Sequence, residues 1–146
     1  MQRRLFLGSM LGVAAAGTPL SRALAALADA PLAGDLPATR LGGGETVLTR
    51  AAVKDFQASL RGPVLMAGQD GYDHARKVWN GMIDRRPALI VRCSAAADVA
   101  RSVQFATAND LLVAFRSGGH STSGQSVCEG GLLIDAIRKS PHAVLL

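Results

Sequence analysis

The apolar residues in the second half of the chain occur in short runs, separated by polar and glycine-rich segments. The runs Ala88–Cys93, Leu111–Phe115 and Leu132–Asp135 have the length and composition of buried strands. Between the first two runs, apolar positions recur at helical spacing from Ser94 to Asn109, and these two residues are the expected caps. Strand, helix and strand in this order predict a βαβ unit with parallel strands, and the fold class is α+β.

Two further helices are predicted before this unit. The first runs from Thr49 to Leu60, with Thr49 as its cap and Val53 and Phe56 on its apolar face, and it ends before Gly62-Pro63. The second is expected after a turn at Gly68–Asp73. Its apolar face is formed by Ala75, Val78 and Met82, with Trp79 beside it.

The first 48 residues have a different composition. Ala30-Pro31, Leu36-Pro37 and Gly42–Gly44 disfavour regular structure, so the region from Leu27 to Gly44 is expected to be a linker. The expected organisation is a signal peptide at 1–25, a linker at 26–48 and a domain at 49–146.

The N-terminus has the features of a targeting segment. Arg3-Arg4-Leu5-Phe6-Leu7 resembles a twin-arginine signal, a mildly apolar run follows, and Ala23-Leu24-Ala25 fits a cleavage site. The run is too short and too weakly apolar to predict a stable membrane span. We therefore expect export to the periplasm or the outside, although an ordinary secretory signal or a buried N-terminal helix would leave a similar pattern.

This segment also accounts for much of the positive charge. The chain has 16 basic and 11 acidic residues, a net charge of +5. Three arginines and no acidic residue lie in the first 25 positions, which leaves 13 basic against 11 acidic residues, or +2. A nucleic-acid partner is therefore not expected.

The most informative stretch follows the second strand and reads Arg-Ser-Gly-Gly-His-Ser-Thr-Ser-Gly. Adjacent glycines let the backbone approach a ligand closely, and successive N–H groups in such a turn form an anion site. Serine and threonine hydroxyls add donors, an arginine adds a fixed charge, and a histidine adds a nucleophilic nitrogen. The candidate cofactor-binding residues are Arg116, Ser117, Gly118, Gly119, His120, Ser121 and Gly124.

Three other interpretations of this stretch stay open at this point. A glycine- and serine-rich segment after a strand is often a plain loop, with a structural or solvated histidine. Gly119–Ser123 nearly fits the nucleophile elbow of a serine hydrolase, but position 123 is serine and no helix is expected to follow. A non-catalytic exported protein, or the product of a broken reading frame, is the third possibility.

The same stretch, followed by Gly130-Gly131-Leu132-Leu133-Ile134-Asp135, resembles the flavin-binding motif of the berberine-bridge-enzyme-like FAD-linked oxidases. These proteins share the vanillyl-alcohol-oxidase type of FAD-binding domain, also called PCMH-type. The order Asp70, Tyr72, Arg76, Trp79-Asn80 and Arg86-Pro87-Ala88 resembles the lead-in of that family. The resemblance covers about Val53 to Asp135.

The resemblance implies FAD as the cofactor, held at the pyrophosphate by this loop and joined covalently to His120. It implies hydride removal from an alcohol or amine carbon of a small-molecule substrate, with O₂ as the acceptor. The family's catalytic bases lie in later domains, so none is expected here, and no metal site is expected. After Asp135 the sequence departs from the family pattern, and we expect an N-terminal part of the domain that is inactive alone.

Cys93 and Cys128 match no metal-binding spacing. In an exported protein they could form a disulfide, and two separate buried thiols are the alternative. A second flavin bond, which some family members form to a cysteine, is not expected at Cys128 because that cysteine belongs to a later motif.

Overall fold

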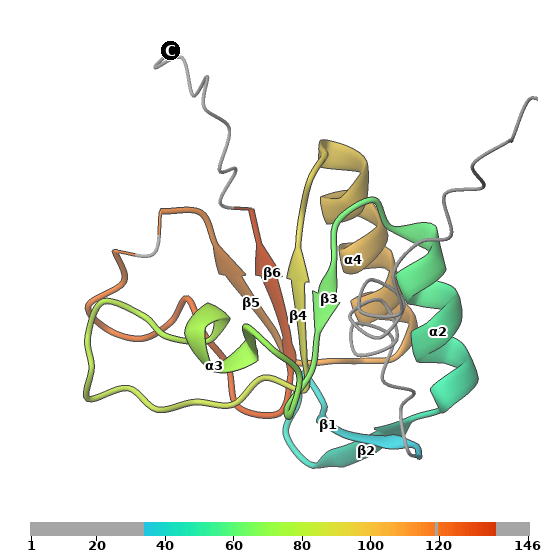
Figure 1. The fold of residues 1–146 in the computed structure, drawn as a ribbon. Helices are drawn as coiled ribbons and strands as arrows, with labels where there is room; N and C mark the ends of the chain where they lie inside the picture. The colour runs from blue at the N-terminus through green and yellow to red at the C-terminus, as the bar shows by residue number, and fades with distance from the viewer. Residues whose placement is uncertain (1–33, 119, 137–146) are drawn as a thin grey trace, which may run out of the picture. The chain divides into compact units, whose positions relative to one another are not determined.

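The computed structural model describes residues 34–118 and 120–136, so the predicted signal peptide, Gly119 and the last ten residues lie outside the described residues. Within the described part, a four-stranded sheet has the order β3-β4-β6-β5, and two further strands form a hairpin. The elements are β1 (Leu36–Thr39), β2 (Glu45–Leu48), α2 (Arg50–Ser59), β3 (Val64–Leu65), α3 (Tyr72–Ala75), β4 (Leu89–Arg92), α4 (Ala96–Ala108), β5 (Val113–Arg116) and β6 (Leu132–Asp135) (Figure 1).

The predicted βαβ unit is present, and its two strands are not neighbours. β4 and β5 both run parallel to β6, which lies between them, while β3 pairs antiparallel with the outer side of β4. Ile90, Leu133 and Ala114 align across the three parallel strands, as do Arg92, Asp135 and Arg116 at their carboxyl ends. β6 is fully buried because it has a strand on each side and packing on both faces.

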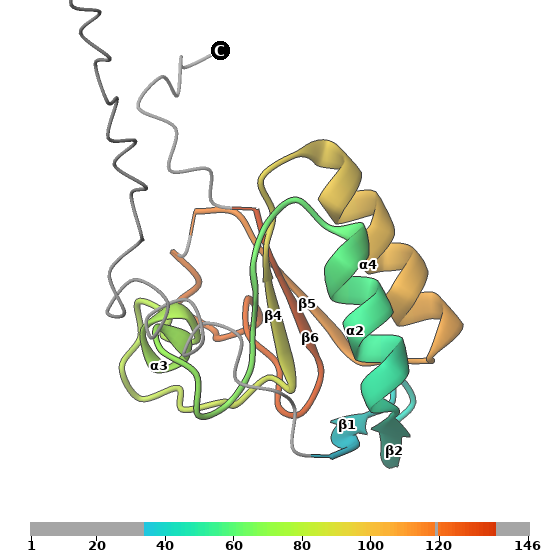
Figure 2. The ribbon, with the colours of Figure 1, turned by 45° about the vertical axis from the view of Figure 1, so that its right-hand side comes forward.

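One face of the sheet is covered by α2 and α4, which lie side by side in both views (Figure 2). Val53 and Phe56 of α2 are buried there, and the ring of Phe56 stacks on that of Phe105 from α4 with centroids 4.0 Å apart. The predicted first helix is confirmed, and the Thr49 hydroxyl caps it by accepting the Ala52 N–H at 3.2 Å.

The start of α4 is organised by Asp98 and not by Ser94. The cap residue is Ala95, and Ser94 contributes only its backbone N–H, which donates to Asp98 Oδ2 at 2.9 Å. The fully buried carboxylate also accepts the N–H groups of Arg61 and Gly62, so it ties α4 to the turn after α2. An aspartate in the first helical turn does this work better than a serine because it accepts several bonds at once.

The other face of the sheet is covered mainly by irregular chain. The predicted helix around Trp79 is wrong: α3 ends at Ala75, and residues 77–88 contain no helix. Ala75 and Val78 do pack under the sheet, but Trp79 is 78% exposed and Met82 is 91% exposed. The apolar residues at helical spacing therefore do not form a buried helical face.

The linker predicted at 26–48 contains two paired strands, although its prolines and glycines disfavour regular structure. Leu36–Thr39 pairs antiparallel with Glu45–Leu48, and Gly43 and Gly44 lie in the turn with positive φ. Ala38 and Leu48 are buried in the helix-side core, and the Thr39 N–H donates to Gly130 O at 2.8 Å. Pro37 is tolerated because this is a two-stranded hairpin with open edges.

The strand predicted at Leu111–Phe115 is shifted and only half-buried. In β5, Ala114 and Arg116 are buried, whereas Val113 and Phe115 are exposed on the face that carries the helices. β5 is the edge strand, and α2 and α4 do not extend over it (Figure 1).

Among the helices of the described residues, none has the length and hydropathy needed to cross a bilayer.

Candidate functional site

Two irregular segments lie side by side on the sheet face opposite α2 and α4. The glycine loop, residues 117–131, connects the carboxyl end of β5 to the start of β6. The strap, residues 76–88, connects α3 to the start of β4. Since β5 and β6 are parallel, the glycine loop must return along the sheet to its opposite edge.

Hydrogen bonds join the strap to the glycine loop at successive points. Lys77 O accepts from Arg116 Nη1 at 3.0 Å, and Asn80 Nδ2 donates to Thr122 O at 3.0 Å. At the far end the Ala88 N–H donates to Gly131 O at 2.8 Å. The residue numbers rise together along both segments, so the two run in the same direction.

The middle of the glycine loop is held by Arg85 and Ile83. Arg85 Nη1 donates to Gly124 O and Val127 O, both at 3.0 Å. Gly124 has φ +73°, and a Cβ there would lie 2.9 Å from the Ile83 side chain. Glycine at 124 therefore meets two needs, a left-handed backbone and close contact with the strap.

The strap itself is fixed by polar side chains. Arg76 forms ion pairs with Asp73 and Asp84, and its guanidinium lowers the pKa of both carboxyl groups. The buried Tyr72 hydroxyl donates to Pro87 O at 2.6 Å, and burial raises the pKa of this phenol. The lead-in residues singled out in the sequence thus hold the strap in place.

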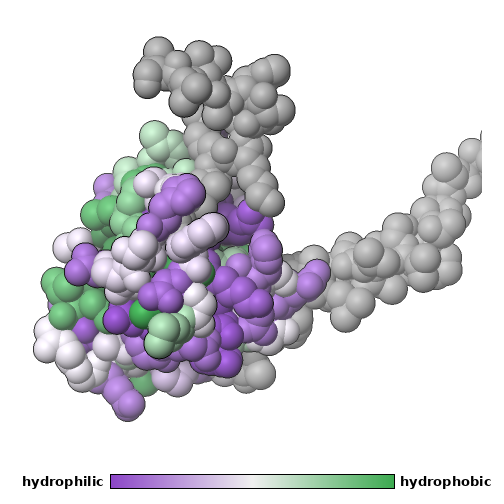
Figure 3. All heavy atoms as spheres, turned by 90° about the vertical axis from the view of Figure 1, so that its left-hand side faces the viewer, coloured by the Kyte–Doolittle hydropathy of each residue, from purple (hydrophilic) through white to green (hydrophobic). Residues whose placement is uncertain are grey.

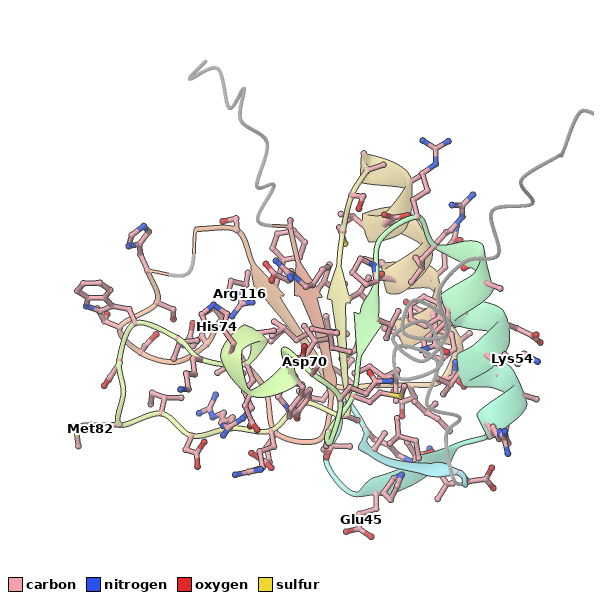
Figure 4. The ribbon with its side chains drawn as sticks, in the orientation of Figure 1. Glu45, Lys54, Asp70, His74, Met82 and Arg116 are labelled. Atoms are coloured by element: carbon pink, nitrogen blue, oxygen red, sulfur yellow. The ribbon has the colours of Figure 1, made fainter. Side chains whose placement is uncertain are left out.

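Arg116 is buried at the point where the glycine loop leaves β5. Its Nη2 lies 2.5 Å from Asp135 Oδ2, and both side chains are 5% exposed. Because its Nη1 also donates to Lys77 O, the guanidinium connects β5 with both β6 and the strap (Figure 4). The positive charge of Arg116 is therefore paired inside the protein. A direct contact between Arg116 and the cofactor stays a prediction.

The start of the glycine loop contains hydrogen-bond donors that lack partners in the described residues. Within the described residues, the backbone N–H groups of 117, 118 and 120–123 have no backbone acceptor, and the hydroxyls of Ser117, Ser121, Thr122 and Ser123 have no hydrogen-bond partner. Such a donor set suits a ligand with several anionic oxygens. His120 is exposed, and its Cδ2 lies 3.1 Å from where a Cβ of residue 118 would be, so Gly118 leaves room for the imidazole.

Two buried polar atoms near this loop lack partners among the described residues. They are Arg116 Nε, where the loop begins, and Ser126 Oγ, two residues beyond Gly124. Orphaned buried polar atoms are uncommon in folded proteins. Together with the donors that lack partners at the start of the loop, they fit a loop that accommodates a polar ligand such as the pyrophosphate of FAD.

The structure weighs against two of the alternatives left open by the sequence. A nucleophile elbow runs straight from a strand through its serine into a helix, and residues 120–131 contain no helix. Cys93 and Cys128 are both free and buried, in the hydrophobic clusters on opposite faces of the sheet. Burial raises the pKa of each thiol to about 11, so both are poor nucleophiles at neutral pH.

No cluster of three or more histidine, cysteine or acidic side chains that could hold a metal ion occurs in the described part of the chain. The sequence had not marked Asn80, Ile83, Arg85 and Asp135 as residues that shape the loop. The bonds of Asn80 and Arg85 join positions about forty residues apart, so no local pattern indicates them.

Comparisons with known proteins agree with this geometry. Residues 87–142 match the FAD binding domain family. The chain is 40% identical over 77 residues to (R)-6-hydroxynicotine oxidase of Paenarthrobacter nicotinovorans, and 35% identical over 77 residues to an uncharacterized FAD-linked oxidoreductase of Bacillus subtilis. These alignments cover 53% and 52% of this chain and 17% of each relative.

Among solved structures, BBE-like 1 of Physcomitrella patens aligns with a TM-score of 0.53 and 26% identity, over 57% of this chain and 18% of that protein. The predicted fold is confirmed over the aligned part. The chain thus spans less than a fifth of the length of the relatives it matches. The match of residues 87–142 to the FAD binding domain family and the similarity to FAD-linked oxidases confirm the resemblance predicted from the glycine loop.

Proposed function

We propose that this chain supplies the pyrophosphate-binding loop and the flavin tether of an FAD-dependent oxidase acting on an alcohol or amine carbon. The observation that carries the proposal is the set of donors without partners at residues 117, 118 and 120–123, held against the strap at the carboxyl end of β5. Ligands of open α/β sheets bind at this edge. FAD, when bound, supplies the hydride-accepting ring, and the chain supplies position and hydrogen bonds.

The residues proposed to hold FAD are divided by exposure. Ser117, Gly118, His120 and Ser121 are accessible and would meet the cofactor directly. Arg116 and Gly124 are buried and would act by shaping the loop, while Gly119 lies outside the described residues. His120 is proposed as the covalent attachment point, and O₂ as the electron acceptor, in keeping with the oxidase among the relatives.

We expect FAD binding to the 146-residue chain to be reversible and weak. A few hydrogen bonds from one loop contribute on the order of 1 kcal/mol each, against an association cost of roughly 4–15 kcal/mol. Equilibrium dialysis of the chain with FAD measures this, with ADP as the competitor. Saturable binding that ADP displaces supports the loop as the pyrophosphate site; no retained FAD at millimolar concentration contradicts it.

The tether is tested in a chimera. The 77-residue segment of (R)-6-hydroxynicotine oxidase that matches this chain is replaced by the matching residues of this chain, so that the remaining domains are present. We expect flavin to stay with the polypeptide after acid precipitation, and His120→Ala to release it. Acid-stable flavin in the His120→Ala chimera removes His120 from this role. Gly119→Val should lower FAD affinity more than His120→Ala, because it crowds the backbone at the phosphate.

Export by the twin-arginine route is proposed for the same protein, since that route carries folded proteins with their cofactors loaded. Arg3→Lys with Arg4→Lys, in a reporter fused after Ala25, keeps the charge and loses the guanidinium geometry. We expect export of the reporter to stop. Unchanged export of the double variant indicates an ordinary secretory signal.

A further inference from the structure

One large apolar side chain on the strap is left uncovered next to the exposed part of the glycine loop. Trp79 is 78% exposed, whereas its neighbour Val78 packs into the core under the sheet. Seen from the side of α3 and β5, the surface of the molecule carries hydrophobic patches separated by hydrophilic ones (Figure 3). The position of this indole is fixed by the contacts on either side of it.

The strap contacts place Trp79 opposite Ser117, Gly118 and His120 at the start of the glycine loop. Lys77 is bonded to Arg116, and Asn80 is bonded to Thr122. Trp79 lies between these two anchors on the strap, and Ser117–Ser121 lies between the same two anchors on the glycine loop. That stretch contains Gly118 and His120, both exposed.

The backbone at this position is held firmly enough to present a side chain. The Asn80 side chain also accepts the Met82 N–H at 3.1 Å, and Asn80 O accepts the Ile83 N–H at 3.0 Å. These bonds close a turn directly after Trp79. An exposed indole on an anchored backbone offers a flat apolar surface at little entropic cost.

We propose that Trp79 is a cofactor-positioning residue whose indole packs against the flavin ring system when FAD occupies the glycine loop. The inference rests on the proposed function, and it adds a second wall to the site from the strap. Aromatic side chains bind planar rings by stacking, and such a contact favours FAD over ADP, which lacks the isoalloxazine ring. Met82, 91% exposed on the same strap, points away from the molecule beyond the Asn80 turn (Figure 4).

Trp79 is the only tryptophan in the chain, so its indole N–H gives a single resonance that reports on this position. We would titrate the ¹⁵N-labelled 146-residue chain with FAD and, separately, with ADP. At equal occupancy, FAD should shift the indole resonance at least several-fold more than ADP, while both ligands shift the backbone amides of 117, 118 and 121. NMR detects weak binding, so low affinity does not prevent the measurement.

Variants give the second readout. Trp79→Ala should weaken FAD binding about 3–10-fold and leave ADP binding within twofold, and Trp79→Phe should restore most of the loss. Met82→Ala is the matched control and should change neither affinity. Equal indole shifts with FAD and ADP, or equal losses of both affinities in Trp79→Ala, overturn the role of Trp79 and leave the proposed function standing. Absence of amide shifts with either ligand overturns both.

Discussion

The two faces of the sheet are covered in different ways. On one face, α2 and α4 bury Val53, Phe56 and Ala106 by ordinary helix packing. On the other, the strap and the glycine loop are joined to each other largely by bonds between side chains and backbone carbonyls. The helix face resembles a core built for stability, whereas the loop face carries all the exposed candidate site residues.

This difference has a physical reason. The middle of a helix satisfies its own backbone groups and presents only side chains to a ligand, while an irregular loop leaves backbone N–H groups free for one. The cost is that the remaining backbone groups of the loop and the strap need partners, which Arg85 and Asn80 provide for the loop and Arg116 for the strap. Substitutions on the loop face should therefore change both stability and FAD binding, and those on the helix face only stability.

Arg116→Met is expected to have the largest effect. It removes the guanidinium from the buried Asp135 carboxylate and breaks the bond by which Arg116 holds Lys77 O of the strap. Removing one member of a buried ion pair costs about 3–5 kcal/mol. Urea unfolding should show this loss. Arg116→Lys keeps the charge without the forked guanidinium, so its unfolding free energy should lie between those of the wild type and Arg116→Met. A loss below 1 kcal/mol would contradict the joining role of Arg116.

Asp98→Asn tests the helix face. The carboxylate accepts backbone N–H groups from Arg61, Gly62, Ser94 and Ala95, and an amide cannot accept them all. We expect a loss of about 2–4 kcal/mol in unfolding free energy with FAD affinity of the folded protein unchanged. Ser94→Ala is the control, because only the backbone of Ser94 is used, and it should cost little.

The same residue makes stability depend on pH. Burial alone would raise the Asp98 pKa, but the backbone donors from Arg61, Ser94, Gly62 and Ala95 outweigh it and lower the value. A lowered folded-state pKa contributes stability above the unfolded value of about 3.9, and this contribution is lost as pH falls through the folded value. Between pH 5 and pH 2 the wild-type unfolding free energy should fall more steeply than that of Asp98→Asn. Parallel curves would assign the acid sensitivity elsewhere.

Gly124→Ala, compared with Gly68→Ala, separates the effect of the contact with Ile83 from that of the left-handed backbone. Both Gly124 (φ +73°) and Gly68 (φ +86°) have left-handed backbones, but only at Gly124 would a Cβ meet Ile83, at 2.9 Å. Gly68→Ala should cost about 1 kcal/mol and Gly124→Ala about 1 kcal/mol more. Ile83→Val in the Gly124→Ala background should recover part of the difference. Equal costs at the two glycines would mean that the strap does not press on the loop.

Asn80→Ala should have the smallest effect on stability, about 0.5–1 kcal/mol, because its bond to Thr122 O is exposed. Its effect on FAD should be the more visible one, since it releases the strap beside the donors of the loop. We expect a several-fold weaker FAD affinity by equilibrium dialysis. Asn109→Ala, which removes an Asn bond to Phe105 O on the helix face, is the matched control and should leave FAD affinity unchanged.

Sequence reasoning worked where periodicity and burial act together. Leu132–Asp135 is buried on both faces and forms β6 as predicted, and the Thr49 cap and Phe56 face define α2. It failed for the strap, where the spacing of Ala75, Val78 and Met82 fits a helix but no helix forms beyond Ala75. Bonds between residues about forty positions apart decide the strap conformation, and no local pattern encodes them.

The sheet order has a consequence for how the protein is made. β6 is the last of the four strands to leave the ribosome, yet it sits between β4 and β5 and is the partner of both. Until residue 135 has emerged, β4 and β5 lack this shared neighbour, and their Val- and Leu-rich stretches have open hydrogen-bonding edges. A chain stalled within the glycine loop should therefore be held by chaperones, and the proposed flavin site should form in one step with insertion of β6.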